Sequence, residues 1–153
     1  MARTQSAGVV MYRRRGADLE VLLVHPGGPF WAKKDAGAWS IPKGEFCAGE
    51  APASAARREF TEETGLALTG ELTPLTPIAQ SHGKTVHPFA VEGDFNPAAV
   101  TSNTFTLEWP PRSERMQSFP EIDRAAWFTL DEARQKIVTG QRLILDELRE
   151  RFA

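Results

Sequence analysis

The sequence predicts an α/β sandwich, in which a β-sheet carries helices on both of its faces. Three observations predict it: apolar and β-branched runs recur along the chain, a helical segment stands between them at 52–64, and leucines recur at helical spacing near the carboxyl end. The chain has 153 residues and a hydrophobic composition of 41%, which is about the size of one average domain. We therefore expect a single domain over residues 1–153.

Six apolar or β-branched segments are predicted to form strands. A charged segment containing Gly16 joins the first two, a pattern typical of a hairpin. A loop rich in glycine, aromatic residues and lysine is expected at 26–38, and residues 93–120, which hold four prolines, are expected to be mostly loop. The predicted strands are 7–12, 19–25, 39–42, 85–92, 105–109 and 125–128, of which 39–42 is expected to deliver Lys43 and Gly44 to a functional site.

The helix predicted at 52–64 has a start signal and a stop signal. Pro52 lies near its first turn, and Gly65 follows its last residue. Its inner side is expected to present Ala55, Ala56 and Phe60 to the sheet.

Two further helices are predicted at the carboxyl end. Thr129, followed three residues later by Glu132, forms a capping-box pattern that opens a helix to about residue 138. Gly140 interrupts the pattern. The last helix is expected to pack on the sheet through Leu143, Leu145, Leu148 and Phe152.

The helix at 52–64 carries an unusual concentration of negative charge. Glu59, Glu62 and Glu63 fall at i, i+3 and i+4, so their carboxylates share one face and repel one another by about a few tenths of a kcal/mol per pair. A bound cation would remove that repulsion. Gly44 and the turn residues after it form a loop whose backbone can approach the same face. The arrangement predicts a divalent-metal site suited to hydrolysing a diphosphate.

The same stretch resembles the Nudix box of the Nudix hydrolase family. With seven fixed residues each used at about 7%, a chance match somewhere in the chain is on the order of one in a million. The resemblance implies a Nudix-type α/β/α sandwich with a mixed β-sheet between helices, and a hydrolase of phosphoanhydrides. The matching residues run Gly44, five others, Glu50, seven others, then Arg58-Glu59-Phe60-Thr61-Glu62-Glu63-Thr64-Gly65-Leu66.

The resemblance also implies roles for the residues of the box. Mg²⁺ or Mn²⁺ would be held by Glu59, Glu62 and Glu63, together with a backbone carbonyl at Lys43 or Gly44. Mg²⁺ prefers six oxygen ligands and usually takes one or two carboxylates plus phosphate oxygens, so these residues leave room for substrate. Glu50 and Arg58 are implied as a structural pair that fixes the loop against the helix, and Gly65 completes the box.

The general base is open between two positions. Family members use either a box glutamate, here Glu59, or a carboxylate from outside the box. The outside candidate is Glu121, six residues before Trp127, a spacing that resembles the Nudix hydrolases of diadenosine polyphosphates. Glu121 is as readily interpreted as an ordinary loop carboxylate, and Glu108 and Glu114 are weaker rivals.

Basic and aromatic residues near the box are candidates for substrate binding. Lys43 stands in a Trp-Ser-Ile-Pro-Lys-Gly string at 39–44, which resembles the lead-in to the box of the same diadenosine polyphosphate enzymes. Other lysines are either phosphate contacts or solvated surface residues, and the aromatic residues either stack a nucleobase or pack in the core and loops. These further candidates are Lys33, Lys34, Lys84, Phe30, Trp31 and Trp109.

Charge and composition exclude several other classes of protein. The net charge of −2 gives no basic field for long nucleic acid or an anionic membrane, and no apolar run approaches the ~20 residues that span a bilayer. Cys47 is the only cysteine, so no internal disulfide can form, and a cytoplasmic location is expected. The histidines, His25, His82 and His87, lack the spacing of a zinc site.

The expected partner is therefore a small nucleotide, and the oligomeric state is not indicated. The first hypothesis is hydrolysis of a dinucleoside polyphosphate by metal-activated water. One rival is a pyrophosphohydrolase that removes oxidised (d)NTPs from the nucleotide pool. Another is a Nudix-like domain that senses a nucleotide without turnover, but such domains often lose box glutamates, and this chain retains all of them.

Overall fold

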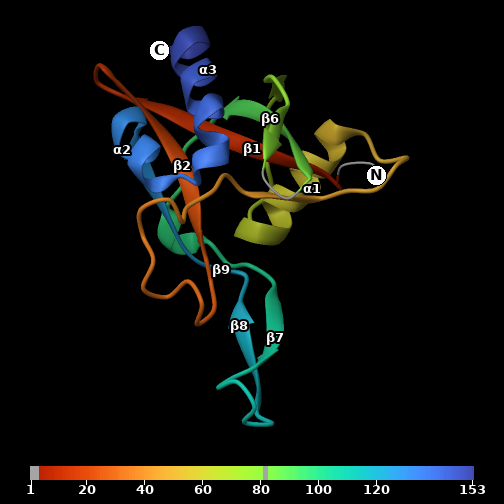
Figure 1. Cartoon of the computed structure of the whole chain (residues 1–153). Helices are drawn as coiled ribbons and strands as arrows, with labels where there is room; N and C mark the ends of the chain where they lie inside the picture. The colour runs from red at the N-terminus through yellow and green to blue at the C-terminus, as the bar shows by residue number, and fades with distance from the viewer. Residues whose placement is uncertain (1–3, 81–82) are drawn as a thin grey trace.

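The computed structural model describes residues 4–80 and 83–153, and a twisted β-sheet forms its centre (Figure 1). The strands are β1 Thr4–Arg15, β2 Asp18–Pro26, β3 Lys43–Glu45, β4 Thr73–Pro74, β5 Ile78–Gln80, β6 Lys84–Glu92, β7 Thr104–Glu108, β8 Met116–Pro120 and β9 Ile122–Thr129. The helices are α1 Pro52–Thr64, α2 Leu130–Lys136 and α3 Arg142–Phe152, with short 3₁₀ turns η1 Pro97–Ala99 and η2 Thr139–Gln141. In the described residues, no helix is long and apolar enough to cross a bilayer.

The main sheet is mixed, as the predicted fold class requires. Its order is β4-β6-β1-β2-β9, with β3 paired to β1 and β5 paired to β6. β1 and β6 run parallel, whereas β2 is antiparallel to both of its neighbours. The hairpin predicted between the first two strands is present, with Gly16 at its turn in a left-handed conformation.

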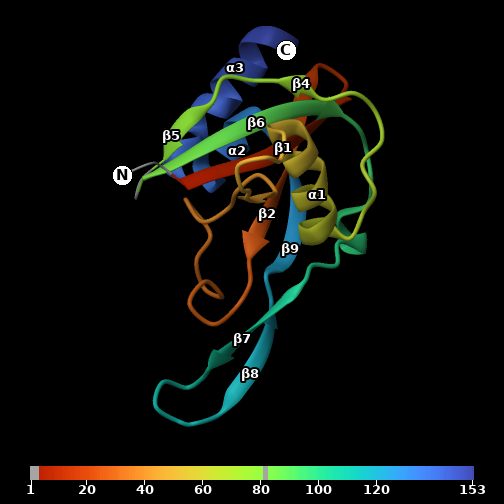
Figure 2. The same cartoon turned by 90° about the vertical axis from the view of Figure 1, so that its right-hand side faces the viewer.

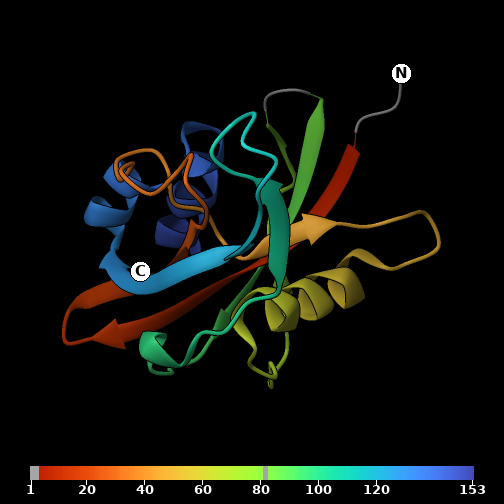
Figure 3. The same cartoon turned by 90° about the horizontal axis from the view of Figure 1, so that it is seen from below.

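Helices cover both faces of the sheet, which confirms the α/β/α sandwich (Figures 2 and 3). Side chains alternate across a strand, so neighbouring residues of β1 enter different cores. Val9 packs with Phe60 of α1, and Val10 packs with Leu145 and Leu148 of α3. Because β1 is buried on both sides, the middle of its sequence is a continuous apolar run.

The strand predicted at 39–42 is wrong. That segment makes only isolated bridges, Ser40 to Val24 and Trp39 to Ile137, and the strand that reaches the site is β3, further along the chain. Gly8 of β1 explains the shift, because a Cβ there would lie 2.6 Å from the Pro42 carbonyl oxygen and from the Lys43 Cβ. The missing side chain lets the chain close onto β1 at Lys43.

The prediction that residues 93–120 are mostly loop missed one strand, β8. β7 matches the strand predicted at 105–109, and β8 pairs with it in a two-stranded ladder, from Thr104 opposite Pro120 to Glu108 opposite Met116. This hairpin lies outside the main sheet and projects away from the body of the protein (Figure 1). β8 has few β-branched residues and ends in proline, so its sequence gives little strand signal. The short strands β4 and β5 were not predicted either.

The helices begin and end close to their predicted limits. Gly65 caps α1 in a left-handed conformation with φ 75°, and its N–H donates to the Thr61 carbonyl at 2.7 Å. Thr129 and Glu132 form the predicted capping box of α2. In α3, Leu145 and Leu148 are buried as expected, but Leu143 is 65% exposed and Ile144 takes the inner position.

Leu143 and Leu148 offer a matched test of this packing. Leu148→Ala should lower the free energy of unfolding by about 2–5 kcal/mol, because Leu148 is 0% exposed and its removal leaves a cavity. Leu143→Ala should change it by less than about 0.5 kcal/mol. Urea denaturation of both variants measures the difference, and equal losses would contradict the position of α3 on the sheet.

Candidate active site

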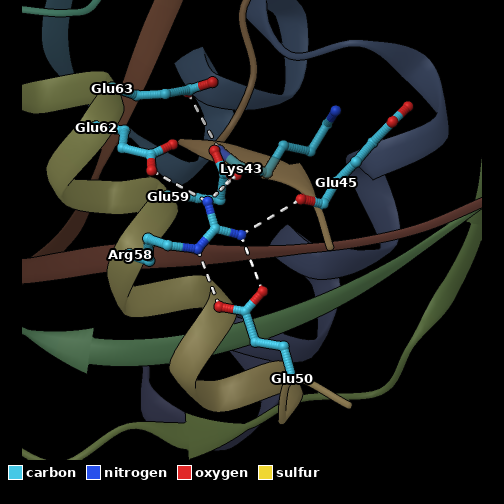
Figure 4. Close-up of polar contacts among 7 residues, drawn as sticks. All are labelled: Lys43, Glu45, Glu50, Arg58, Glu59, Glu62 and Glu63. Carbon is cyan, nitrogen blue, oxygen red and sulfur yellow. Dashed lines mark hydrogen bonds and ion pairs between the residues drawn. The ribbon is translucent and has the colours of Figure 1, made fainter. Parts of the chain in front are cut away.

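The acidic face of α1 lies against the backbone of Lys43 and Gly44 (Figure 4). The Lys43 N–H donates to Glu63 Oε1 at 3.2 Å. The Glu59 carboxylate occupies the space where Gly44 has no side chain, since a Cβ on Gly44 would lie 2.0 Å from Glu59 Oε2. β3 thus holds the loop within contact distance of two of the three carboxylates.

Arg58 ties three carboxylates together. Its Nε and Nη2 donate to the two oxygens of Glu50 at 2.9 and 3.0 Å, which attaches the loop after β3 to the helix. Its Nη1 donates to Glu59 at 2.9 Å and to Glu62 at 3.1 Å. One guanidinium therefore neutralises part of the repulsion on the acidic face, a contact that the repulsion argument from the sequence did not include.

Glu63 lies outside the reach of Arg58 and is the most perturbed carboxylate of the site. Burial raises the pKa of Glu63 to about 8, and the charges of Glu59 and Glu121 act in the same direction, while the Lys43 N–H and ammonium oppose them. Burial, followed by the charge of Glu62, also raises the pKa of Glu59. Burial therefore disfavours the charged form of both carboxylates, of Glu59 in spite of its bond to Arg58 and of Glu63 in spite of the nearby Lys43.

A cavity of about 290 Å³ opens beside these residues, and its charged and aromatic lining comes from four segments of the chain. Glu63 comes from α1, Lys43 from β3, Glu121 from the junction of β8 and β9, and Trp31 from the loop after β2. Apolar side chains such as Ile41 and polar ones such as Gln141 line the rest of it. Burial and the charge of Lys84 lower the pKa of the Lys43 ammonium. The cavity therefore combines an aromatic ring with groups of both charges.

Gln141 is a structural residue of this cavity that the sequence analysis missed. It is fully buried, its Oε1 accepts the Ile41 N–H at 3.1 Å, and its Nε2 donates to Ser40 Oγ at 3.0 Å. These bonds fix the segment that leads to Lys43. The only sequence signal is a polar residue placed between Gly140 and an apolar helical pattern.

Other predicted candidates lie outside the cavity lining. Lys84 begins β6 and influences Lys43 by its charge, but it does not line the cavity. Glu108 and Glu114 belong to the β7–β8 hairpin region, where Glu108 accepts the Arg112 N–H at 3.0 Å. Lys33 is exposed on the loop after β2. Phe30 meets Trp109, with ring centroids 5.3 Å apart, and Lys34 Nζ lies 4.9 Å from the centre of the Trp31 ring.

His25, His87 and Cys47 are separate from the acidic face. His25 is buried between Asp123 Oδ1 at 2.8 Å and the Lys34 carbonyl at 2.6 Å, and His87 is bonded to Gln5 at 2.6 Å. His82 lies outside the described residues, and Cys47 is exposed with a free thiol.

The carboxylates of Glu59, Glu62 and Glu63 are chemically suited to bind a divalent cation, although each of them is hydrogen-bonded to another part of the protein. Carboxylate oxygens are the ligands that Mg²⁺ and Mn²⁺ prefer, and the space left by Gly44 brings one of them to the loop backbone. Across residues 4–80 and 83–153, no three acidic, histidine or cysteine side chains converge as a ready ligand cluster. Glu59 and Glu62 face Arg58, so holding a cation requires their carboxylates to turn from the guanidinium.

Fold and acidic helix together define the class of protein. A family model described as NUDIX domain matches residues 2–148. The chain therefore belongs to the Nudix hydrolase family, whose pyrophosphohydrolases act on acid anhydrides.

The individual proteins that are similar to this chain have different names and activities. An octanoyltransferase of Myxococcus xanthus is 32% identical over 135 residues, which is 88% of this chain and 33% of that protein, so the chain spans about a third of its length. An Ap4A hydrolase of C. elegans, solved as a binary complex, is 22% identical with a TM-score of 0.63, covering 96% of each chain.

The NUDIX domain of Shewanella oneidensis NrtR, solved with ADP ribose, is 16% identical with a TM-score of 0.66, covering 100% of this chain and 90% of that one. At these identities the two solved structures show a shared fold.

Two glycines of the same loop test the contact with α1. Gly44→Ala should weaken Mg²⁺ binding by on the order of tenfold, because the new Cβ displaces the Glu59 carboxylate. Gly49→Ala is the control: Gly49 has φ 99° and nothing within 4 Å of an added Cβ, so the change strains the backbone without touching a carboxylate. Calorimetric titration with Mg²⁺ measures both, and equal affinities would contradict a role for the Gly44 contact.

The raised pKa of Glu63 predicts a pH dependence of stability without metal. Because its folded-state pKa of about 8 exceeds its ordinary value of 4.5, the folded protein binds the extra proton between these values. Stability should therefore rise as pH falls from 8 toward 4.5, by on the order of a few kcal/mol. Urea unfolding with a chelator measures this slope. Glu63→Gln should flatten it, and an unchanged slope in that variant would contradict the assignment.

Proposed function

We propose that this protein is a phosphohydrolase dependent on Mg²⁺ or Mn²⁺ that cleaves a phosphoanhydride of a dinucleoside polyphosphate, acting as a single Nudix domain. The observation that carries the proposal is the cavity in which Glu63, Lys43, Glu121 and Trp31 meet. A polyphosphate needs positive charge on its oxygens, a base for the attacking water and a surface for its nucleobase. These four residues offer each of those groups beside the acidic helix.

The metal site in this proposal consists of Glu59, Glu62, Glu63 and the Gly44 carbonyl. A cation bound there would lower the pKa of the attacking water and neutralise charge on the phosphates. The two carboxylates with raised pKa values gain most from it, since each is partly buried and faces other negative charges. Binding at neutral pH should displace the proton that Glu63 retains.

Two further roles, binding the phosphates and accepting a proton from water, fall to Lys43 and Glu121. Lys43 is suited to donate to a phosphate oxygen as an ammonium, a charge-assisted bond stronger than a neutral one. Glu121 is suited to take a proton from water, because it is exposed at the cavity and close enough to Glu63 and Glu59 to raise their pKa values. Glu59 is the alternative base. Lys84 is a second candidate for the phosphates.

Trp31 is suited to stack one nucleobase. It lines the cavity, is 38% exposed, and has the Lys34 ammonium over its ring. Stacking on an aromatic residue is worth about 1–3 kcal/mol per base and tolerates different bases. The choice of a dinucleoside polyphosphate is supported by the lead-in at 39–44 and by the Glu121 to Trp127 spacing.

A second candidate function is pyrophosphate release from an oxidised (d)NTP, which the same metal and phosphate groups would serve. Sensing of a nucleotide without turnover is a further alternative, which the complete set of box glutamates disfavours. In either case the partner is a small nucleotide rather than long nucleic acid or a membrane. A cytoplasmic location belongs to the proposal and is compatible with one exposed, unpaired cysteine.

Assays of the purified protein with Mg²⁺ separate the candidates. Diadenosine tetraphosphate should yield AMP and ATP, whereas an oxidised (d)NTP substrate would yield pyrophosphate, and chromatography distinguishes these products. Glu62→Gln and Glu63→Gln should each lower kcat by about 100-fold or more. Full activity in both variants would refute the assigned metal ligands.

Glu121 and Glu114 provide a matched pair for the base. Glu121→Gln should lower kcat by about 100-fold or more, whereas Glu114→Gln, on the hairpin away from the cavity lining, should leave kcat unchanged. Full activity in Glu121→Gln would assign the base to Glu59 instead.

A further inference from the structure

Two aromatic side chains, the exposed Phe30 and the half-buried Trp109, form a pair that belongs to neither core. Their ring centroids lie 5.3 Å apart at an angle of 79°, and Phe30 is 58% exposed. Phe30 comes from the loop after β2, and Trp109 follows β7 on the projecting hairpin. Phe30 leaves much of its ring in water away from both cores, where the fold gains little from it, so the pair is a candidate binding surface.

The pair is held in a preset position. Gly27 N–H donates to the Glu121 carbonyl at 2.8 Å, and a Cβ on Gly27 would lie 2.0 Å from the Pro120 carbonyl oxygen. Gly28, with φ 96°, lets the Phe105 ring of β7 approach to within 2.8 Å of where its Cβ would stand. These two glycines lock the loop that carries Phe30 onto the base of the hairpin.

Trp109 is fixed from the other side. Its N–H donates to the Arg115 carbonyl at 2.9 Å, and its own carbonyl accepts from Gln117 Nε2 at 2.6 Å. Both partners flank or belong to β8. A ligand stacking on this ring would therefore not have to order the segment first, which lowers the entropic cost of binding.

The Phe30–Trp109 pair continues the wall of the cavity. Trp31 lines the cavity and directly follows Phe30, and Glu121 lines it at the base of β8. Trp109 stands five residues beyond Thr104 along β7, so at ~3.3 Å per residue it lies about 17 Å from the base of the hairpin. The surface thus runs outward from the catalytic groups over roughly the length of the hairpin ladder.

The size of the cavity decides what this surface can serve. Sites for drug-sized ligands measure about 300–1,000 Å³. The cavity, at about 290 Å³, is at the lower end of that range and is shared with Lys43, Glu63 and Glu121. It can take one nucleobase and adjoining phosphates, so a second nucleobase on the same ligand must lie outside it.

We propose that the Phe30–Trp109 pair is a second nucleobase subsite, which stacks the distal base of a ligand whose first base occupies the cavity at Trp31. The inference rests on the proposed function and assigns the place where the second base of a dinucleoside polyphosphate binds. It also assigns a role to the β7–β8 hairpin, which contributes nothing to the main sheet.

The test compares a two-base probe with a one-base probe. Trp109→Ala and Phe30→Ala should each raise the KM for diadenosine tetraphosphate by about 5-fold or more, with kcat retained, because stacking is lost from both ground state and transition state. The inhibition constant of ATP, which has one base, should stay unchanged. Trp109→Phe should restore most of the loss. Leu143→Ala, which removes an exposed side chain from α3, is the control and should alter neither constant.

The outcomes separate this inference from the proposed function. Suppose that the wild-type protein hydrolyses diadenosine tetraphosphate. If both alanine variants have the wild-type KM, or if they weaken the binding of ATP as much as that of diadenosine tetraphosphate, the subsite is refuted and the function stands. If the wild-type protein hydrolyses neither probe, the proposed function fails. Calorimetric titration with diadenosine tetraphosphate in the presence of Mg²⁺ then tests the subsite by its affinity. A selective loss of dinucleotide affinity in Trp109→Ala supports the subsite there, and equal affinity refutes it.

Discussion

The contact between the acidic face of α1 and the backbone at Lys43 and Gly44 is the constraint on which the site depends. It exists because two glycines remove side chains that would block it: Gly8 lets β3 close onto β1, and Gly44 leaves room for the Glu59 carboxylate. Once the loop is in place, Arg58 can reach Glu50 and hold the loop ends to the helix. The charged groups are therefore positioned by the sheet rather than by their own attraction.

That geometry leaves an electrostatic imbalance. Arg58 serves Glu50, Glu59 and Glu62 at once, while Glu63 is buried with a single backbone N–H and the nearby Lys43. A chain selected only for stability would not bury a carboxylate whose pKa is raised to about 8 beside other acids. Such conflicts concentrate where a ligand relieves them, and the cavity next to Glu63 is where a cation and a polyphosphate would do so.

Local signals predicted much of this fold, and long-range contacts account for what they missed. Residues close together in the sequence determine α1, its Gly65 cap and the capping box at Thr129. The position of β3 was missed because it depends on Gly8, some 35 residues earlier, and β8 because its pairing with β7 compensates for a weak strand sequence. Gln141 reaches Ile41 across about 100 residues, a contact that no local pattern encodes.

The residues proposed for the chemistry of the site and those proposed for its ligand selectivity lie on different parts of the fold. The carboxylates stand on α1 and Lys43, the lysine proposed to bind phosphate, on β3. Both elements are packed into the main fold, whereas Trp31, Phe30 and Trp109 stand on a loop and a hairpin outside the main sheet. Loops and hairpins can change in sequence without disturbing either core. The junction at Gly27, Pro120 and Glu121 joins the two parts, and it places a candidate base at the foot of the hairpin. A change in hairpin length or sequence would therefore alter which ligand is held, while the groups that act on the phosphates stay in place.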